Sequence, residues 1–259
     1  MAKFVRLDVE DGVGLVRIDR PPANAIDHQL GTELRDVFGE AADRPDVGAV
    51  VIWGGPKLFA AGADIKEMAS FGPDQIRPVV STLGEALDLL EAMPKVAIAA
   101  VDGFALGGGF ELALAADLRY LAAGATVGQP EIRLGVIPGA GGTQRLTHLA
   151  GPAVARDLVY SGRPVDAIEA ARLGLAERVL SDEPVLEVAL RDARAFAAGP
   201  REALAAAKEA IRAALGPDRA AGLAKERDLF VALFDSADQR EGMGAFLEKR
   251  KPRFGSRRP

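Results

Sequence analysis

The sequence contains no cysteine and only two histidines, His28 and His148. The absence of cysteine excludes thiol nucleophiles, disulfide frameworks, iron–sulfur clusters and zinc sites built on thiolates. Two histidines far apart in the chain also exclude a metal site built on several imidazoles. Any chemistry that depends on histidine must therefore use one of these two residues.

Long apolar runs are missing as well. No segment approaches the ~18 consecutive apolar residues of a membrane span. The first eight residues alternate polar and apolar instead of forming the apolar stretch of a signal peptide. We therefore expect no membrane association and a place in the cytoplasm. The 259 residues are 49% hydrophobic and 27% charged, which predicts one or two folded globular domains.

Positive charge is in deficit, with 32 basic against 37 acidic side chains and a net charge of −5. This balance argues against a nucleic-acid partner, which usually requires a basic face to neutralise phosphates. The C-terminal tail is an exception. It is interpreted first as a solvated segment, and alternatively as a cradle for a small polyanion. Its basic residues are Lys249, Arg250, Lys251, Arg253, Arg257 and Arg258.

Hydrophobic patterning predicts an α/β body followed by a helical module. Residues 4–10 and 13–19 alternate apolar and polar around Asp11-Gly12, which predicts a β-hairpin. Buried-type strands then alternate with helices up to residue 183, beyond which only helical spacing remains. The predicted strands are Val47–Trp53, Val96–Val101, Leu118–Ala122 and Ala176–Leu180, and the predicted helices are Asp27–Ala42, Gln75–Met93, Glu111–Ala116, Gly142–Leu149, Asp166–Leu173, Pro184–Ala198, Arg201–Leu215, Arg219–Asp235 and Asp238–Lys249.

Glycine-rich turns between strands and helices carry the densest functional signal. Phe104–Glu111 follows the strand Val96–Val101 and opens a helix. Glycine lets a ligand approach the backbone closely, and the free amides at a helix start stabilise a negative oxygen. Phe59–Met68 follows Val47–Trp53 in the same way. Amides from two such turns would form an oxyanion pocket. The glycine spacing does not fit a dinucleotide fingerprint, and a P-loop is excluded because Gly-Lys-Ser/Thr is absent.

Two glutamates lie close to these turns, and each has a structural alternative. Glu111 stands in an otherwise apolar helix, where a carboxylate is costly to bury unless it has partners or a function. The alternative is that it complements the helix dipole. Glu131 lies in a glycine- and proline-bounded segment, and its spacing alone favours a surface ion pair with Arg133. Asp64 is a candidate N-cap for the helix that follows it.

Four ordered motifs resemble the enoyl-CoA hydratase members of the crotonase superfamily. They are residues 59–68 (FAAGADIKEM), 104–112 (FALGGGFEL), 128–131 (GQPE) and 137–146 (IPGAGGTQRL), and a matching tail lies near residues 241–250. The resemblance implies a spiral of repeated ββα units as a catalytic core over residues 1–197. It also implies a helical trimerisation module over residues 198–259, and a homotrimer or a hexamer made as a dimer of trimers.

The same resemblance assigns the site residues. It implies that the amides of Ala63 and Gly108 hold a thioester oxygen, that Glu111 and Glu131 are paired catalytic carboxylates, and that the Gly139 region helps to place water. The positions that match the binding path of CoA and its nucleotide are Ala25, Lys57, Ala61, Ala63, Asp64, Ile65, Lys66, Gly108, Phe230 and Lys249, the last two in a neighbouring subunit. No cofactor is implied, because the CoA thioester is the substrate.

The implied reaction is addition of water to a 2-trans-enoyl-CoA, giving a 3-hydroxyacyl-CoA, as in fatty-acid beta-oxidation. We assign Glu131 as the donor of the α-carbon proton and Glu111 as the activator of water. The alternatives are an isomerase, hydrolase or decarboxylase of the same superfamily, a serine peptidase on a related scaffold, and a non-enzymatic RNA-binding relative. The motif Asn24–Asp27 departs from the commoner Asn-Ala-Leu-Asn, and residues 68–83 match least, so acyl length is not predicted.

Overall fold

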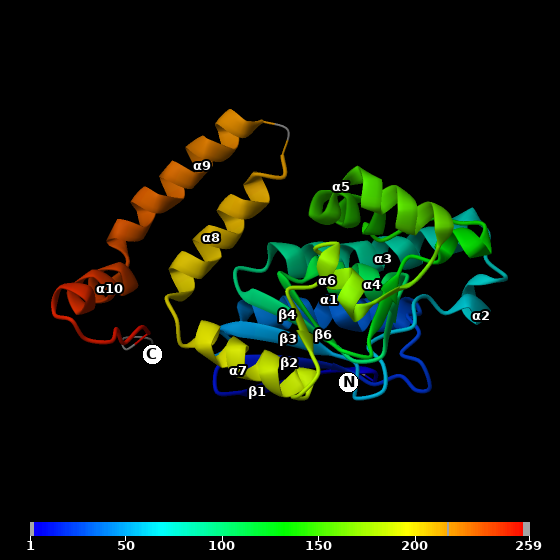
Figure 1. The fold of residues 1–259 in the computed structure, drawn as a ribbon, viewed down its shortest axis with the longest axis horizontal. Coiled ribbons are helices and arrows are strands. Elements are labelled where there is room, and N and C mark those ends of the chain that lie inside the picture. Colours follow the sequence, from blue (N-terminus) through cyan, green and yellow to red (C-terminus); the bar gives the residue numbers. More distant parts are fainter. Residues whose placement is uncertain (1–2, 217, 256–259) are drawn as a thin grey trace.

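The computed structural model describes residues 3–216 and 218–255, which form an α/β body with a helical extension (Figure 1). The main sheet has six strands in the order β1-β2-β3-β4-β6-β9, and only the β1–β2 pair is antiparallel. Its strands are β1 (Val5–Glu10), β2 (Val13–Ile18), β3 (Ala49–Trp53), β4 (Val96–Val101), β6 (Leu118–Ala122) and β9 (Arg178–Leu180). A second sheet has the order β5-β7-β8, formed by β5 (Phe104–Leu106), β7 (Thr126–Gly128) and β8 (Val165–Asp166).

The N-terminal hairpin is confirmed. Val5 pairs with Ile18 and Glu10 with Val13, so Asp11 and Gly12 form a two-residue turn. Both have positive φ, 51° and 78°, which matches the right-handed twist of the strands.

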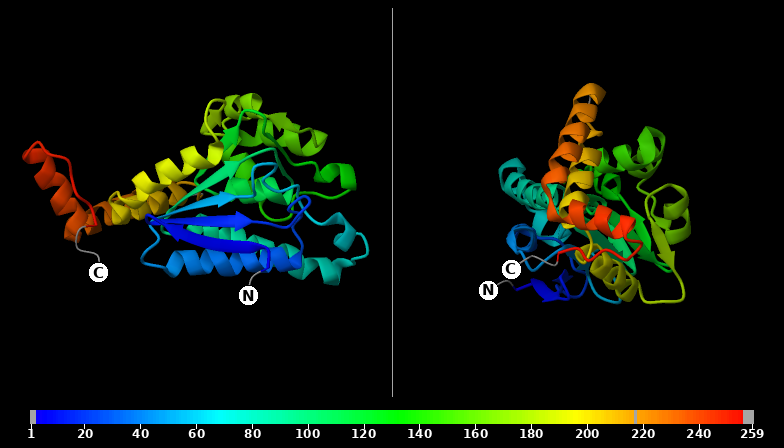
Figure 2. Two further views of the ribbon diagram at one scale, coloured as in Figure 1. Left: turned by 90° about the horizontal axis from the view of Figure 1, so that it is seen from below. Right: turned by 90° about the vertical axis from the view of Figure 1, so that its left-hand side faces the viewer.

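Helices cover both faces of the main sheet, as the two side views show (Figure 2). On one face α1 (His28–Asp43) and α3 (Pro73–Ala92) pack their apolar stripes against β2, β3 and β4. On the other face α7 (Val185–Ala197) buries Val185 and Val188 against Leu15 and Val51. Parallel strands buried on both faces read as continuous apolar runs, which is why they were recognisable in the sequence.

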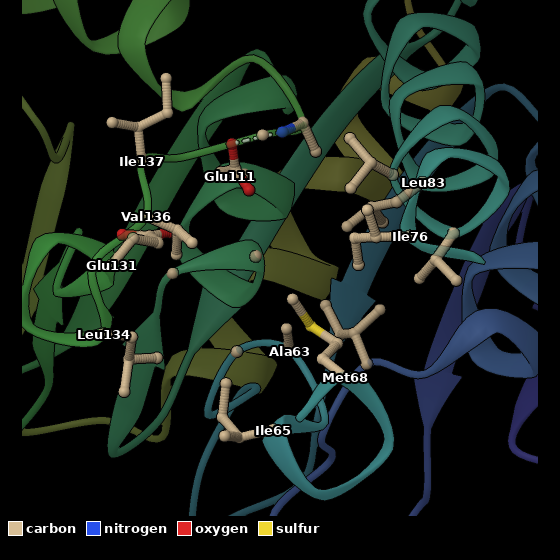
Figure 3. Close-up of a pocket in the computed structure, with 18 of the residues that line it drawn as sticks. Ala63, Ile65, Met68, Ile76, Leu83, Glu111, Glu131, Leu134, Val136 and Ile137 are labelled. Atoms are coloured by element: carbon tan, nitrogen blue, oxygen red, sulfur yellow. Dashed lines mark hydrogen bonds between the residues drawn. The ribbon is translucent and has the colours of Figure 1, made fainter. Parts of the chain in front are cut away.

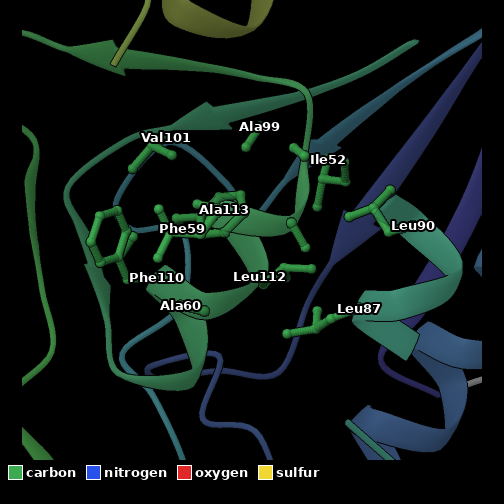
Figure 4. Packing of buried hydrophobic residues seen from close by; sticks show 14 of the residues in the cluster. Ile52, Phe59, Ala60, Leu87, Leu90, Ala99, Val101, Phe110, Leu112 and Ala113 are labelled. Carbon is green, nitrogen blue, oxygen red and sulfur yellow. The ribbon is translucent and has the colours of Figure 1, made fainter. Parts of the chain in front are cut away.

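The spiral arises because short strands follow the long ones. β4 is followed by β5 and α4 (Gly108–Ala115), and β6 is followed by β7 and α5 (Gly142–Ser161). A parallel bridge between Ala60 and Ala105 continues the same pattern after β3. Every residue of α4 is buried, and Phe110 and Leu112 pack among Phe59, Leu87 and Leu90 (Figure 4). The ββα spiral implied by the resemblance is therefore confirmed.

Several predicted boundaries were wrong. The strands β5, β7 and β8 were missed, since two or three residues carry no readable period. The helix predicted over Gly142–Leu149 is confirmed as the first part of α5, which Gly151 interrupts with a non-helical backbone (φ 81°, ψ 164°). The second part of α5, which begins at Pro152 and runs to Ser161, was missed. The helix carrying Glu111 begins at Gly108, and α3 begins at Pro73, where a missing N–H costs nothing at a helix start.

Smaller helices connect these units. They are α2 (Ile65–Met68), the 3₁₀ turn η1 (Glu131–Leu134) and α6 (Ala167–Arg172). The predicted cap at Asp166 is confirmed, since its carboxylate accepts from the Glu169 amide at 2.8 Å, and Gly174 follows α6 with φ 76°.

The C-terminal helices extend away from the sheet as a separate arm (Figures 1 and 2). They are α8 (Arg201–Ala213), α9 (Arg219–Ala232), the turn η2 (Leu233–Asp235) and α10 (Ala237–Leu247). Lys208 ties α8 to the body, because its buried ammonium donates to Asp117 at 2.8 Å and to the carbonyls of Leu90 and Lys95. The division at residue 197/198 remains a prediction. Within the described ranges, no helix is long and apolar enough to cross a bilayer.

Candidate active site

A cavity of about 390 Å³ lies between α2, α3, the start of α4, η1 and the turn that precedes α5 (Figure 3). Most of its wall is apolar, and two carboxylates and two glycine-rich turns interrupt it. The lining residues include Ile26, Ala61, Gly62, Ala63, Ile65, Met68, Ile76, Val79, Val80, Leu83, Gly107, Gly108, Glu111, Glu131, Leu134, Val136, Ile137, Gly139 and Ala140. The motifs at residues 59–68, 104–112, 128–131 and 137–146 therefore meet at one place.

Backbone pairing exposes the Ala63 amide to this cavity. Ile26 and Ala63 form a parallel bridge in which the Ile26 amide donates to Gly62 and the Asp64 amide donates to the Ile26 carbonyl. Because a parallel bridge uses the groups on either side of residue 63, the Ala63 N–H points away from Ile26. Across the described residues, the Ala63 amide donates to no backbone carbonyl.

Gly108 supplies the second amide at the first position of α4, where an N–H has no partner within the helix. A Cβ on Gly108 would lie 3.9 Å from the Ala63 nitrogen, so the two amides are neighbours. The preceding Gly107 has φ 51° and ψ −125°, a conformation that favours glycine. Two adjacent amides, one of them at the positive end of a helix, provide a site for a developing oxyanion.

Glu111 is 3% exposed and is held by the turn that precedes α5. Its Oε1 atom accepts from the amides of Ala140 at 2.8 Å and Gly142 at 2.7 Å. Burial raises the pKa of this carboxyl, while the two amides and the nearby Arg145 charge act in the opposite direction. A side chain at position 142 would crowd Glu111, because a Cβ there would lie 2.9 Å from Oε1.

Glu131 begins η1 and points its carboxylate into the same cavity (Figure 3). Burial raises the pKa of Glu131 to about 7, and the Glu111 charge adds to this shift. The sequence-based interpretation of a surface pair with Arg133 was wrong: Glu131 lines the cavity, and among the described residues it forms no ion pair with Arg133. The pattern around residue 131 could not reveal this, since β7 was not predicted and the direction of the side chain depends on it.

The predicted CoA-binding residues separate into two groups. Ala61, Ala63, Ile65 and Gly108 line the cavity, as does Gly139, whose backbone lies against Val80 of α3. Phe230 and Lys249 lie on the C-terminal arm at the far end of the chain, away from this cavity (Figure 1).

The remaining predicted CoA-binding residues are not among those that line the cavity. Lys57 and Lys66 are exposed, and Ala25 is half-buried beside Ile26. Asp64 is an N-cap, as predicted, and accepts from the amides of Lys66 at 3.2 Å and Glu67 at 3.4 Å.

The basic tail is partly neutralised within the chain. Arg250 pairs with Glu241 and Glu248, so its guanidinium is not a free anion site. Arg257 and Arg258 lie outside the described residues.

The aspartate at position 27, where the family more often has asparagine, has a local role in this structure. Asp27 caps α1 by accepting from the Leu30 amide at 2.8 Å, and it contacts Arg20.

Two polar residues beside the glutamates were missed in the sequence. Gln129 is fully buried, and with its amide oriented to satisfy both groups it donates to Glu131 Oε1 at 2.8 Å and Oε2 at 3.2 Å. Arg145 donates to the Ala140 carbonyl and pairs with Asp88 and Glu91 of α3. Both residues lie within the sequence motifs, but their contacts with the groups around the two carboxylates are visible only in the folded structure.

Comparison with known proteins agrees with this geometry. Residues 8–257 match the enoyl-CoA hydratase/isomerase family. The chain is 44% identical to a probable enoyl-CoA hydratase of Mycobacterium leprae, covering 98% of each chain. It is 40% identical to a crotonyl-CoA hydratase of Syntrophomonas wolfei, covering 97% of each. An enoyl-CoA hydratase structure from Bacillus anthracis superposes with a TM-score of 0.92 at 37% identity, covering 96% and 98% of the two chains. The chain belongs to the enoyl-CoA hydratase/isomerase family.

Proposed function

We propose that the protein is an enoyl-CoA hydratase that adds water across the double bond of a 2-trans-enoyl-CoA and releases a 3-hydroxyacyl-CoA. One observation carries this proposal: two carboxyl side chains, Glu111 and Glu131, line one cavity together with the two adjacent amides of Ala63 and Gly108. The names of the relatives from Mycobacterium leprae and Syntrophomonas wolfei support the same reaction.

The reaction begins with polarisation of the thioester. The amides of Ala63 and Gly108 hold the carbonyl oxygen, so electron density leaves the β-carbon and collects as an enolate at that oxygen. One such donor is worth ~10²–10³ in rate. The apolar wall keeps bulk water out and strengthens these hydrogen bonds.

The two glutamates divide the proton transfers. Glu111 Oε1 is occupied by two amides, which leaves Oε2 facing the cavity to take a proton from the attacking water (Figure 3). The water oxygen bonds to the β-carbon, and the enolate then takes a proton at the α-carbon from Glu131. A carboxyl with a pKa of about 7 carries a proton in a large fraction of molecules near neutrality. The pair titrates as one coupled unit, so a proton exchange between them restores the starting state.

An isomerase, hydrolase or decarboxylase of the same family is the alternative. Double-bond migration needs only one acid that moves a proton between two carbons, whereas hydration uses a second one to activate water. The presence of both Glu111 and Glu131 in the cavity therefore favours hydration.

A panel of 2-enoyl-CoA substrates from four carbons upward tests the proposal. Hydration removes the conjugation of the enoyl thioester, so its ultraviolet absorbance should fall on addition of the enzyme, with 3-hydroxyacyl-CoA as product. Conversion of 3-enoyl-CoA to 2-enoyl-CoA without hydration would instead assign the isomerase reaction.

The pH dependence of the reaction follows from Glu131. The raised pKa of about 7 means that the protonated donor is lost as pH rises through this value. We therefore expect kcat/KM for crotonyl-CoA to fall above pH 7, by up to about tenfold per pH unit. The measurement covers pH 5.5 to 9, with circular dichroism recorded at each pH as the control for folding. A flat profile over this range would contradict the role of Glu131 as the proton donor.

We further propose a homotrimer or a dimer of trimers, without a bound cofactor, that acts on acyl-CoA in the cytoplasm as in fatty-acid beta-oxidation. The C-terminal arm supports assembly, because five large apolar side chains on it stay mostly exposed in the part of the chain that the structure describes: Ile211, Phe230, Val231, Phe246 and Leu247 are 61–82% exposed. An apolar surface of this kind is typical of an interface. The bacterial relatives support the proposed cytoplasmic location.

Assembly is testable through the most exposed of these side chains. Phe246 is 82% exposed on α10, so an aspartate there should leave the fold of a monomer intact and place a charge in the interface. We expect sedimentation velocity to give trimers or hexamers for the wild type and smaller species for Phe246→Asp. If both proteins sediment as the same assembly, α10 is not part of the interface.

A further inference from the structure

One arginine connects the loops around the Ala63 amide. Arg20 follows β2, and its side chain is 22% exposed. Its Nη2 atom lies 2.8 Å from Asp27 Oδ2 and 2.8 Å from Asp64 Oδ2. Its Nη1 atom donates to the carbonyl of Ala25 at 2.8 Å. A single planar guanidinium therefore holds two carboxylates and one carbonyl.

The two carboxylates belong to residues that cap helices. Asp27 caps α1, and Asp64 caps α2 immediately after the Ala63 amide. Asp64 uses Oδ1 for the helix amides and Oδ2 for Arg20, so both oxygens are fixed. Ala63 therefore directly precedes a residue whose side chain is held both by the first amides of α2 and by Arg20.

At its start this segment pairs with β5 through the Ala60–Ala105 bridge, and toward the loop at residues 20–27 its backbone is held by three hydrogen bonds. The Ile26–Ala63 bridge uses two hydrogen bonds, and a third runs from the Ala61 amide to the Ala23 carbonyl at 3.0 Å. α2 itself is only four residues long and contains no buried residue. A short exposed helix cannot keep its own first turn in place, so the direction of the Ala63 N–H depends on these loop contacts.

We propose that Arg20 is a positioning residue for the oxyanion pocket, which fixes the Ala63 N–H by joining the capping carboxylates of Asp27 and Asp64. This inference rests on the proposed function, because it takes the Ala63 amide as a donor to the thioester oxygen. Electrostatics predict the direction in which the loops move when Arg20 is removed. Both carboxylates contact the same nitrogen, so removal of the cation leaves two adjacent negative charges that repel. The loops at residues 20–27 and 60–64 then move apart, and the amide moves with them.

The test compares Arg20→Met with a matched variant, Arg17→Met. Arg17 lies on β2, the strand that Arg20 follows; it pairs with Asp8 and stacks on Trp53, away from the cavity. We expect Arg20→Met to lower kcat for crotonyl-CoA by about 10- to 100-fold with a smaller change in KM, since a displacement of about 1 Å can have this effect. Arg17→Met should keep wild-type kcat. The double variant Arg20→Met/Asp27→Asn should recover part of the loss, because one of the two repelling charges is gone.

A vibrational readout separates positioning from a structural role. Butyryl-CoA labelled with ¹³C at its carbonyl cannot be hydrated, and amide donors shift its C=O stretch to lower frequency in proportion to their strength. Isotope-edited infrared spectra should show the shift for wild type and Arg17→Met and a smaller shift for Arg20→Met. Lower thermal stability with an unchanged carbonyl band and kcat would overturn the inference.

A second variant and the behaviour of the wild type separate failure of the inference about Arg20 from failure of the proposed function. If Arg20→Met does not fold, Arg20→Gln/Asp27→Asn removes the ion pairs with less charge imbalance, and its carbonyl band is judged in the same way. If the wild type neither hydrates crotonyl-CoA nor shifts the carbonyl band, the proposed function fails. If the wild type does both and the Arg20 variants match it, only the inference about Arg20 fails.

Discussion

Replacement of Glu131 or Glu111 by glutamine should reduce kcat for the hydration of crotonyl-CoA by about 10²- to 10⁴-fold in each single variant. Glutamine has nearly the same shape as glutamate but cannot give or take a proton near neutral pH. In Glu111→Gln the amide oxygen can still accept from the Ala140 and Gly142 amides, so the turn should stay in place. The loss then reports proton transfer and not a collapsed cavity. Steady-state kinetics by absorbance gives the measurement.

A matched carboxylate provides the control for this experiment. Glu85 lies exposed on α3 and pairs with Arg35, so Glu85→Gln should retain wild-type turnover. Binding of butyryl-CoA should persist in all three variants, since neither glutamate is needed to hold the CoA portion. Turnover close to wild type in either Glu111→Gln or Glu131→Gln would contradict the assignment of paired acids.

A single methyl group at Gly109 should disrupt both the fold and the oxyanion pocket. A Cβ at this position would lie 2.2 Å from the carbonyl oxygen of Ala60 and 2.8 Å from its carbonyl carbon, and both are backbone atoms that cannot rotate away. The first turn of α4 must then shift and carry the Gly108 amide with it. We expect Gly109→Ala to lower the free energy of unfolding by about 3 kcal/mol or more. Where the variant folds, kcat should fall about 10²-fold.

Gly84→Ala is the matched comparison. Gly84 lies inside α3, and a Cβ there would meet nothing within 4 Å. Alanine favours a helix over glycine by up to about 1 kcal/mol, so urea unfolding should show unchanged or higher stability. Wild-type stability and turnover in Gly109→Ala would show that α4 does not pack on Ala60 as closely as the structure places it.

Much of the main sheet was predictable because its strands obey simple rules. Val96–Val101 was predicted and observed with the same bounds, since a central parallel strand covered on both faces is a continuous apolar run. Asp64 and Asp166 were predictable as capping residues, because a cap depends on amides only two or three positions along the chain. Such features are local, so the residues themselves carry them.

The active site could be predicted only in part from local sequence features. Resemblance to a family singled out Glu131, while its spacing alone favoured a surface pair with Arg133. Its burial depends on β7 and on the partner strands of the second sheet, which are too short to have a period. The position of Arg145 likewise depends on a distant segment, because its guanidinium pairs with Asp88 and Glu91 of α3.

The amino-acid order by itself determined the alternation of strands and helices, the caps and the family motifs, since each depends on neighbours within a few residues. Tertiary structure alone decided that Glu111 and Glu131 share one cavity, that the Ala63 N–H faces it, and that Arg20 bridges Asp27 and Asp64. The physical reason is distance along the chain. Burial, pKa and hydrogen-bond direction depend on groups that belong to different segments of the chain, and only packing places them within a few ångströms of each other.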